Sequence, residues 1–110
     1  MAGASYHSKA VEDAASLLGA QVRQARIERG WTARELADRA GVSLPTLLKV
    51  EHGDPSVSLG TALGAAVLTG VPLFYEDHGR VGAEAVRARE RATLLAERVR
   101  RPAEDISYDF

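Results

Sequence analysis

The alternation of apolar and polar positions predicts that the folded part of the chain begins with a helix near residue 13. The apolar residues that follow recur along roughly one face of a 3.6-residue period: Leu17, Leu18, Val22, Ala25 and Ile27. Gly30 ends this run, because glycine adopts the left-handed backbone that often terminates a helix. Residues 1–12 show no such period, so we expect them to form a flexible N-terminal arm.

Two short helices are predicted between residues 32 and 53. Thr32 and Glu35 have the spacing of a capping box, in which each side chain bonds the other residue's backbone amide. Gly41 then ends the first helix, and Ser43 can cap the second, with Pro45 in a first turn that tolerates its missing N–H. The apolar positions of these two helices are Leu36, Ala37, Ala40, Leu47, Leu48 and Val50.

The remaining pattern predicts two more helices and a tail. Ser58 is a suitable cap for a helix over about residues 59–69, which Gly70 and Pro72 end. Residues 73–75 are either a hydrophobic plug or the start of a further helix. Residues 76–99 are rich in Ala and Arg and predict a C-terminal helix, and residues 100–110 are expected to be an extended tail.

The fold class predicted from these elements is all-α, with five helices. Residues 13–75 form the expected domain. Its core is predicted to consist of aliphatic side chains, since only 5% of the residues are aromatic: Leu18, Val22, Leu36, Leu47, Val50, Leu63, Val67 and Leu73.

The stretch from Thr32 to Gly53 has the features of a helix-turn-helix. Ala37 is small where the second helix would cross the first, and Gly41 permits the left-handed turn between them. Apolar residues stand where they would hold the two helices together: Leu36, Val42, Leu47 and Val50. The alternative is an αα-hairpin that has no role in DNA binding.

Charge and composition narrow the classes of function. The net charge is −1, from 14 basic and 15 acidic residues, which leaves DNA binding open because the distribution of charge matters more than its sum. The absence of cysteine excludes a disulfide framework, a thiol nucleophile and a Cys-ligated zinc. The first residues lack a signal-peptide pattern, and the apolar run at residues 59–75 is too short and too interrupted to span a bilayer. The chain is expected to be cytoplasmic.

The histidines offer little for catalysis. His7, His52 and His78 fall in the arm, at a helix end and in a loop, and no metal-ligand spacing, catalytic triad or glycine-rich phosphate loop accompanies them. We therefore expect no enzymatic activity, no cofactor and no metal.

The segments VRQARIERGWTARELADRAGVSLPTLLKVEHG and PSVSLGTALGAAVLTGVPL resemble the lambda-repressor-like, or Xre, helix-turn-helix family of bacterial and phage regulators. The resemblance implies that Arg26 and Glu51 form a structural ion pair between the first and third helices. It also implies that the third helix enters the major groove and that its first turn contacts base edges.

Carried onto this chain, the base-reading positions are Leu44, Pro45, Thr46 and Lys49, and Ser43 would bind phosphate at the start of the helix. The phosphate contacts implied elsewhere are Arg23, Arg34, Ser56 and Ser58, with Lys49 able to serve both purposes. One departure is Ala33, where the family usually has a Gln that bridges phosphate and the third helix. This departure predicts modest affinity per half-site and greater dependence on DNA shape and dimerisation.

The C-terminal segment ERATLLAERVRRPAEDISYDF resembles the end of HipB-like antitoxins, Xre regulators that accompany a HipA-type serine/threonine kinase. In an extended strand, Ile106, Tyr108 and Phe110 would lie on one face and could dock on a partner. The alternatives are an acidic tail that keeps the chain soluble and a strand that pairs with its copy in a dimer.

The function predicted from the sequence is sequence-specific repression of transcription by a homodimer on a palindromic operator. The finer prediction is an antitoxin that represses its own operon and holds a HipA-like kinase inactive. The alternatives are a stand-alone repressor and an interaction adaptor that does not bind DNA.

Overall fold

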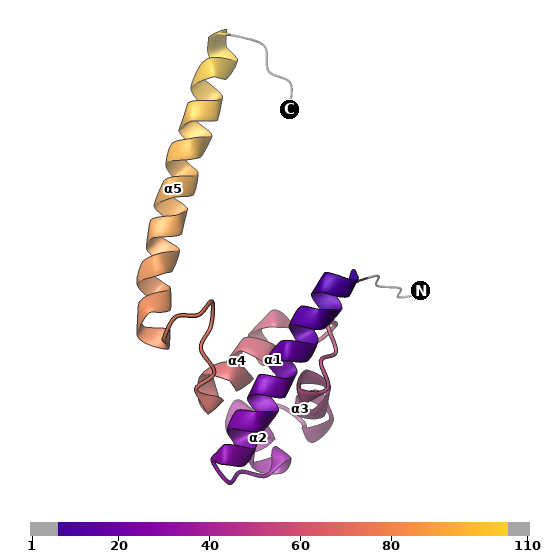
Figure 1. Cartoon of the computed structure of the whole chain (residues 1–110). Coiled ribbons are helices and arrows are strands. Elements are labelled where there is room, and N and C mark those ends of the chain that lie inside the picture. The colour runs from indigo at the N-terminus through magenta and orange to yellow at the C-terminus, as the bar shows by residue number, and fades with distance from the viewer. Residues whose placement is uncertain (1–6, 106–110) are drawn as a thin grey trace. The chain divides into compact units, whose positions relative to one another are not determined.

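A computed structural model describes the backbone of residues 7–105 and the side chains of residues 7–100. The described chain contains five helices and no strand, so the predicted all-α class is confirmed (Figure 1). The helices are α1 (Lys9–Glu28), α2 (Ala33–Ala40), α3 (Leu44–Glu51), α4 (Leu59–Thr69) and α5 (His78–Asp105). The chain divides into one unit that ends at Leu73 and contains α1 to α4, and a second that begins at Phe74 and contains α5.

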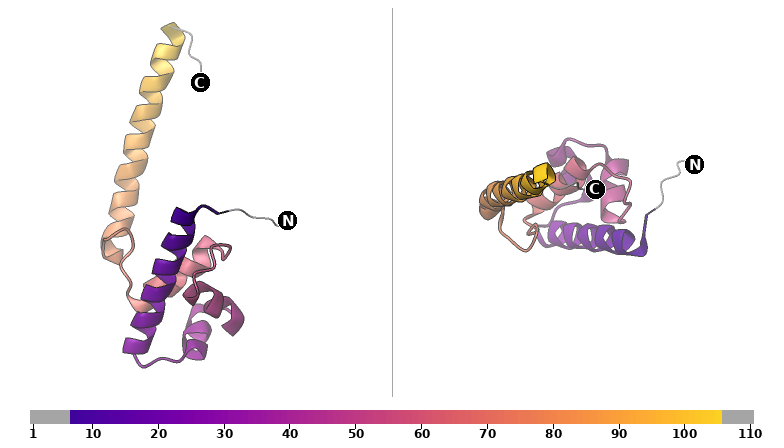
Figure 2. Two further views of the ribbon diagram at one scale, coloured as in Figure 1. Left: turned by 45° about the vertical axis from the view of Figure 1, so that its right-hand side comes forward. Right: turned by 90° about the horizontal axis from the view of Figure 1, so that it is seen from above.

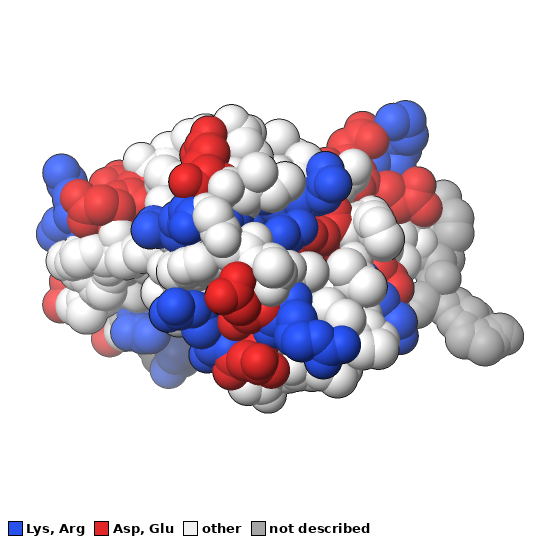
Figure 3. Space-filling model, turned by 90° about the horizontal axis from the view of Figure 1, so that it is seen from below, with Lys and Arg blue, Asp and Glu red and all other residues white. Residues whose placement is uncertain are grey.

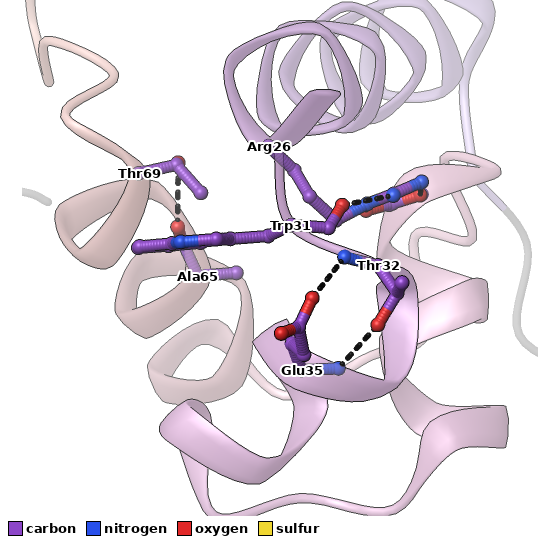
Figure 4. A network of polar contacts seen from close by, with 7 residues as sticks. Arg26, Trp31, Thr32, Glu35, Ala65 and Thr69 are labelled. Atoms are coloured by element: carbon purple, nitrogen blue, oxygen red, sulfur yellow. Dashed lines mark hydrogen bonds and ion pairs between the residues drawn. The ribbon is translucent and has the colours of Figure 1, made fainter. Parts of the chain in front are cut away.

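The helix starts follow from the caps that the sequence contains. Thr32 Oγ1 accepts a hydrogen bond of 3.0 Å from the Glu35 amide, and the Thr32 amide donates one of 2.7 Å to Glu35 Oε1, which completes the capping box of α2 (Figure 4). Ser43 and Ser58 accept bonds of 3.2 Å from amides three residues on, at the starts of α3 and α4.

The helix ends in this unit use the left-handed glycines that the pattern indicated. Gly41 after α2 has a φ of 70° and Gly70 after α4 has a φ of 81°, backbone angles that residues with a Cβ rarely adopt. The Gly41 turn lets α3 depart from α2 after only three intervening residues, residues 41–43, which creates the compact connection of a helix-turn-helix.

Helices α1 and α2 both pack against α3 and α4, as the views of Figure 2 show for the first unit. Val22, Leu36 and Leu47 are completely buried at the centre. The buried apolar residues are Val22, Leu36, Ala37, Leu47, Val50, Ala65, Ala66 and Val71, with Leu18 and Leu73 partly buried against them. Four of the eight predicted core residues are therefore fully buried.

The prediction that Val67 belongs to the core is wrong. Its side chain is 47% exposed, and Ala65 and Ala66 face the core instead. Helix α4 is apolar around its whole circumference, so the sequence pattern does not identify the side that is buried. The buried side of α4, which packs against α1 and α2, therefore carries the small side chains of Ala65 and Ala66.

The predicted boundaries of the first and last helices are also wrong. Ser8 caps α1, so the helix begins at Lys9 rather than near residue 13. The helix therefore includes residues 9–12, which the sequence pattern places in the N-terminal arm. Helix α5 begins at His78 rather than at residue 76 and continues past residue 99 to Asp105, which takes up half of the predicted tail. Pro102 removes one backbone donor there without ending the helix.

The aromatic pair before α5 is neither a buried plug nor a helix start. Phe74 and Tyr75 have φ values of 55° and 62° and are 78% and 98% exposed. Two successive positive φ values are typical of a tight turn and are strained for residues other than glycine. Only Leu73, the first residue of the predicted plug, packs partly against the core.

Candidate nucleic-acid interface

Helix α3 is held firmly while one of its faces is left open. Gly19 of α1 is buried where the two helices cross, and a Cβ at this position would overlap the Val50 carbonyl oxygen and lie 2.8 Å from that of Glu51. Leu47 and Val50 turn into the core on the same side of α3. The opposite side is exposed, so α3 is presented to solvent by a rigid base.

An ion pair locks the end of α3 to α1. The Arg26 guanidinium donates from Nε to Glu51 Oε2 at 2.7 Å and from Nη2 to Glu51 Oε1 at 3.0 Å. The side chains are 11% and 2% exposed, and the Glu51 hydrogen bond, more than any other cause, raises the pKa of Arg26. A third bond, 2.9 Å from Arg26 Nη1 to the Trp31 carbonyl, fixes the segment before α2 (Figure 4). This is the pair that the family resemblance implied.

The Trp31 side chain contacts residues at the end of α1 and in α2. Its half-buried ring packs against the core, and the guanidinium carbons of Arg39 and Arg29 lie 4.2 and 5.5 Å from its centroid, within cation–π range. Arg29 also donates from Nε to the Thr69 carbonyl at 3.0 Å. These two arginines therefore have structural contacts, which leaves other basic side chains for a ligand.

The predicted base-reading positions lie on or beside the open face of α3. Ser43, Pro45 and Lys49 are exposed, while Leu44 and Thr46 are half-buried. Leu48 was expected on the apolar side of this helix, but it is 36% exposed and lies three residues after Pro45, on the same face. Leu48 is thus a candidate contact that was missed, although its spacing from Pro45 could have indicated it.

The hydroxyl groups predicted to bind phosphate already have partners. Ser43 Oγ donates to Thr46 Oγ1 at 2.9 Å, and Ser58 Oγ donates to Thr61 Oγ1 at 2.8 Å. Ser56 Oγ donates to Asp54 Oδ1 at 2.7 Å. A phosphate would have to exchange these bonds, so the exposed basic groups are better placed to make a first contact.

The charge around α3 is mixed. Arg23 of α1 and Arg34 of α2 are both exposed, as is Lys49. Asp54 lies in the loop after α3, where hydrogen bonds from Ser56 and the nearby charge of Lys49 lower its pKa, so it remains ionised at neutral pH. Figure 3 shows the resulting pattern on one face of the molecule, where basic and acidic side chains are interspersed rather than forming a continuous basic patch.

The described residues contain no cluster of His, Cys, Asp or Glu able to hold a metal ion. No helix in that part of the chain is long and apolar enough to cross a membrane. The predicted docking residues Ile106, Tyr108 and Phe110 lie outside the described residues.

The fold and the exposed α3 define the class of this site as a helix-turn-helix. Residues 22–75, about half of the chain, match the family model described as helix-turn-helix, and this segment covers α2, α3, α4 and most of α1's second half. The segment is therefore a lambda-repressor-like helix-turn-helix domain, and the match supports a DNA-binding regulator. No match was found among the curated proteins or among the solved structures.

Proposed function

We propose that the chain binds DNA sequence-specifically by inserting α3 into the major groove. The observation that carries this proposal is the combination of a rigidly held α3 with an open face. A major groove about 12 Å wide admits one α-helix, and a helix clamped at its end by Arg26 and Glu51 enters without losing further conformational freedom.

The chemistry of the open face favours a mixed set of base contacts. Lys49 can donate to guanine O6 and N7 or to a phosphate, and Thr46 can bond a base or contact a thymine methyl. Leu44, Pro45 and Leu48 offer only apolar surface, which suits thymine methyl groups. We infer a site in which few direct hydrogen bonds select the sequence and the shape of the DNA contributes to recognition.

The proposed phosphate contacts lie on both sides of α3. Arg23 and Arg34 are exposed on the two helices that pack against it. The Leu44 amide at the start of α3 is a third candidate contact, together with Ser43, since Pro45 has no N–H and the Thr46 amide already bonds Ser43 Oγ. Ser56 and Ser58 would take part after exchanging their present partners. Because Asp54 places a negative charge in the same loop, we expect modest affinity for a single half-site.

We further propose that the chain acts as a homodimer that represses transcription from a palindromic operator. Two helix-turn-helix units read successive half-sites when their recognition helices are one turn of duplex apart, about 34–36 Å. Pairing of two weak half-sites compensates for the limited contacts of each, since the second contact becomes intramolecular.

A salt titration of DNA binding tests this function. Affinity for the DNA upstream of the chain's own reading frame should fall with a log–log slope of about −0.9 for every phosphate contacted. A steep slope together with protection of two half-sites supports the repressor. An absence of binding at low salt, where electrostatic attraction is strongest, contradicts it and favours an adaptor without a DNA-binding role.

The finer proposal is an antitoxin that represses its own operon and inhibits a HipA-like kinase. It is supported by the resemblance of residues 90–110 to the end of HipB-like antitoxins. Co-expression with a kinase encoded by the neighbouring reading frame should yield a complex, and the triple change of Ile106, Tyr108 and Phe110 to Ser should abolish it. If no kinase gene is adjacent, or if co-expression yields no complex, the stand-alone repressor is favoured. A complex that survives the triple change contradicts the docking role of these three residues.

A further inference from the structure

Helix α5 has a continuous apolar seam with the spacing of a coiled coil. Six of its apolar residues follow one another at alternating intervals of four and three positions: Val81, Ala85, Ala88, Ala92, Leu95 and Val99. This 3.5-residue repeat keeps one face of a helix directed at a partner helix over its whole length. Charged residues border the seam, with Glu84, Arg91 and Arg98 along one edge.

The seam carries a hole of the kind that receives a side chain from a second helix. Val81, Glu84, Ala85 and Ala88 are spaced i, i+3, i+4 and i+7, which are the four corners of a coiled-coil hole. They line a groove of about 400 Å³ that is also bordered by Phe74, Glu76 and Arg91, all within the second unit. The two alanines leave this groove too deep to be filled by another alanine.

The chain itself contains the matching side chain. Leu95 lies on the same seam, is 56% exposed, and is the largest residue of the six. When two α5 helices run antiparallel with Ala85 opposite Leu95, each Leu95 enters the hole around Ala85 of the other copy. The remaining layers of the seam are then also complete, with Ala88 opposite Ala92 and Val81 opposite Val99. A parallel pair would place Ala85 against Ala85 and leave both holes unfilled.

The charges along the edge are consistent with this arrangement. In an antiparallel coil of this register, the residues that precede every second core position (84, 91 and 98) face one another across the seam. Glu84 of one copy therefore meets Arg98 of the other, twice per dimer. Glu84 also contacts Arg87 of its own helix at 3.2 Å, and its carboxylate has capacity for a second donor. Arg89 and Arg91 each face their own counterpart near the centre, where long exposed side chains can turn apart in solvent.

We propose that α5 forms an antiparallel coiled coil with α5 of a second copy of this chain, with Leu95 of each copy in the hole of the other. This inference names the interface of the homodimer in the proposed function. The dimer interface is tested without DNA. A chain that dimerises through α5 but binds no operator would therefore contradict the proposed repressor without contradicting the proposed coiled coil.

The oligomeric state of the full chain, measured by sedimentation equilibrium, tests the seam. Leu95→Arg should raise the dissociation constant of the dimer at least about tenfold, because a charge would be buried in the hole. The matched control is Leu94→Arg, since Leu94 is 61% exposed and lies off the seam, and it should leave the constant unchanged. A monomeric wild type, or an equal effect of the two variants, overturns the proposal.

Disulfide trapping tests the direction of the helices, because the chain has no cysteine of its own. When Ala88→Cys and Ala92→Cys variants are mixed and oxidised, the antiparallel coil should yield the mixed 88–92 disulfide as the main product. A parallel coil would yield the 88–88 and 92–92 products instead, and that result contradicts the proposed arrangement. Helicity measured before oxidation should match that of the wild type.

Discussion

The Arg26 guanidinium grips the Glu51 carboxylate with two hydrogen bonds of 2.7 and 3.0 Å and joins residues 25 positions apart in the sequence. This contact fixes the end of the helix whose other face is open to a ligand. The third bond of Arg26, to the Trp31 carbonyl, extends the same constraint to the start of α2. The geometry of the helix-turn-helix therefore depends on one arginine that takes no part in the proposed DNA contact.

Removing one partner of this pair should destabilise the fold strongly. Arg26→Ala leaves the Glu51 carboxylate buried without its partner, and we expect the free energy of unfolding to fall by about 3–5 kcal/mol. Urea denaturation followed by circular dichroism measures this change. Lys9→Ala is the control, because the Lys9–Asp13 pair is exposed and should contribute less than about 1 kcal/mol. Similar losses in the two variants would mean that the buried pair has no special role.

Two glycines provide a matched test of the α1–α3 approach. Gly19→Ala should destabilise the protein by about 1–3 kcal/mol, since the added Cβ overlaps backbone atoms of α3 that cannot move away cheaply. Gly64→Ala should stabilise it by about 0.5–1 kcal/mol, since Gly64 lies within α4 with nothing near the added Cβ. Thermal denaturation of both variants should shift the melting temperature in opposite directions.

The capping box predicts a specific acid sensitivity. Hydrogen bonds from the backbone amide and then from the side chain of Thr32 lower the pKa of Glu35. The Glu35 carboxylate therefore binds a proton less readily in the folded state than in the unfolded state. The stabilisation is complete above the ordinary Glu pKa of about 4.3 and is lost as the pH falls through the lower folded value. Glu35→Gln keeps an acceptor for the Thr32 amide but cannot titrate. The unfolding free energy of this variant should therefore decline less than that of the wild type as the pH falls from about 5 to about 3.

Lys49 should matter for DNA and not for folding. If it bonds guanine or phosphate as proposed, Lys49→Ala should cost about 1–3 kcal/mol of operator affinity, and loss of a phosphate contact would also reduce the salt slope by about 0.9. Lys9→Ala is again the control, since Lys9 is the only other lysine and lies at the start of α1. Fluorescence anisotropy with labelled operator measures both effects, and unchanged binding by the Lys49 variant would contradict the proposed role of α3.

The opposite change is expected at Asp54. Asp54→Asn removes the negative charge near Lys49 but keeps a side-chain oxygen that can accept the bonds from Ser56. Because solvent screens the charge of Asp54, DNA affinity should rise by about fivefold at most at low salt. The gain should shrink as salt is added, and a gain that persists at high salt would indicate a cause other than charge.

Local chemistry accounts for how much of the fold could be predicted. Thr32, Ser43 and Ser58 cap the helices as expected because a cap is formed by residues three positions apart and needs no tertiary information. Helix α1 begins earlier than its apolar pattern indicates, because Ser8 caps it while the apolar period starts only at Leu17. The docking residues at the end of the chain remain a prediction.

The candidate site could be predicted in position but not in detail. The order of α2, the Gly41 turn and α3 located the open helix. The exposure of Leu48 and the partners of the serine hydroxyls depend on which neighbours reach each side chain, and a single helix pattern contains no such information.

The amino-acid sequence by itself determined the helices, their caps and the helix-turn-helix order, because these depend on interactions between residues close together in the chain. Only the tertiary structure decided which side of α4 is buried, since a helix that is apolar all round has no preferred face until its neighbours are in place. It also decided how firmly Arg26 holds α3: the family resemblance implied the pair with Glu51, but the burial that strengthens it is created by the whole unit.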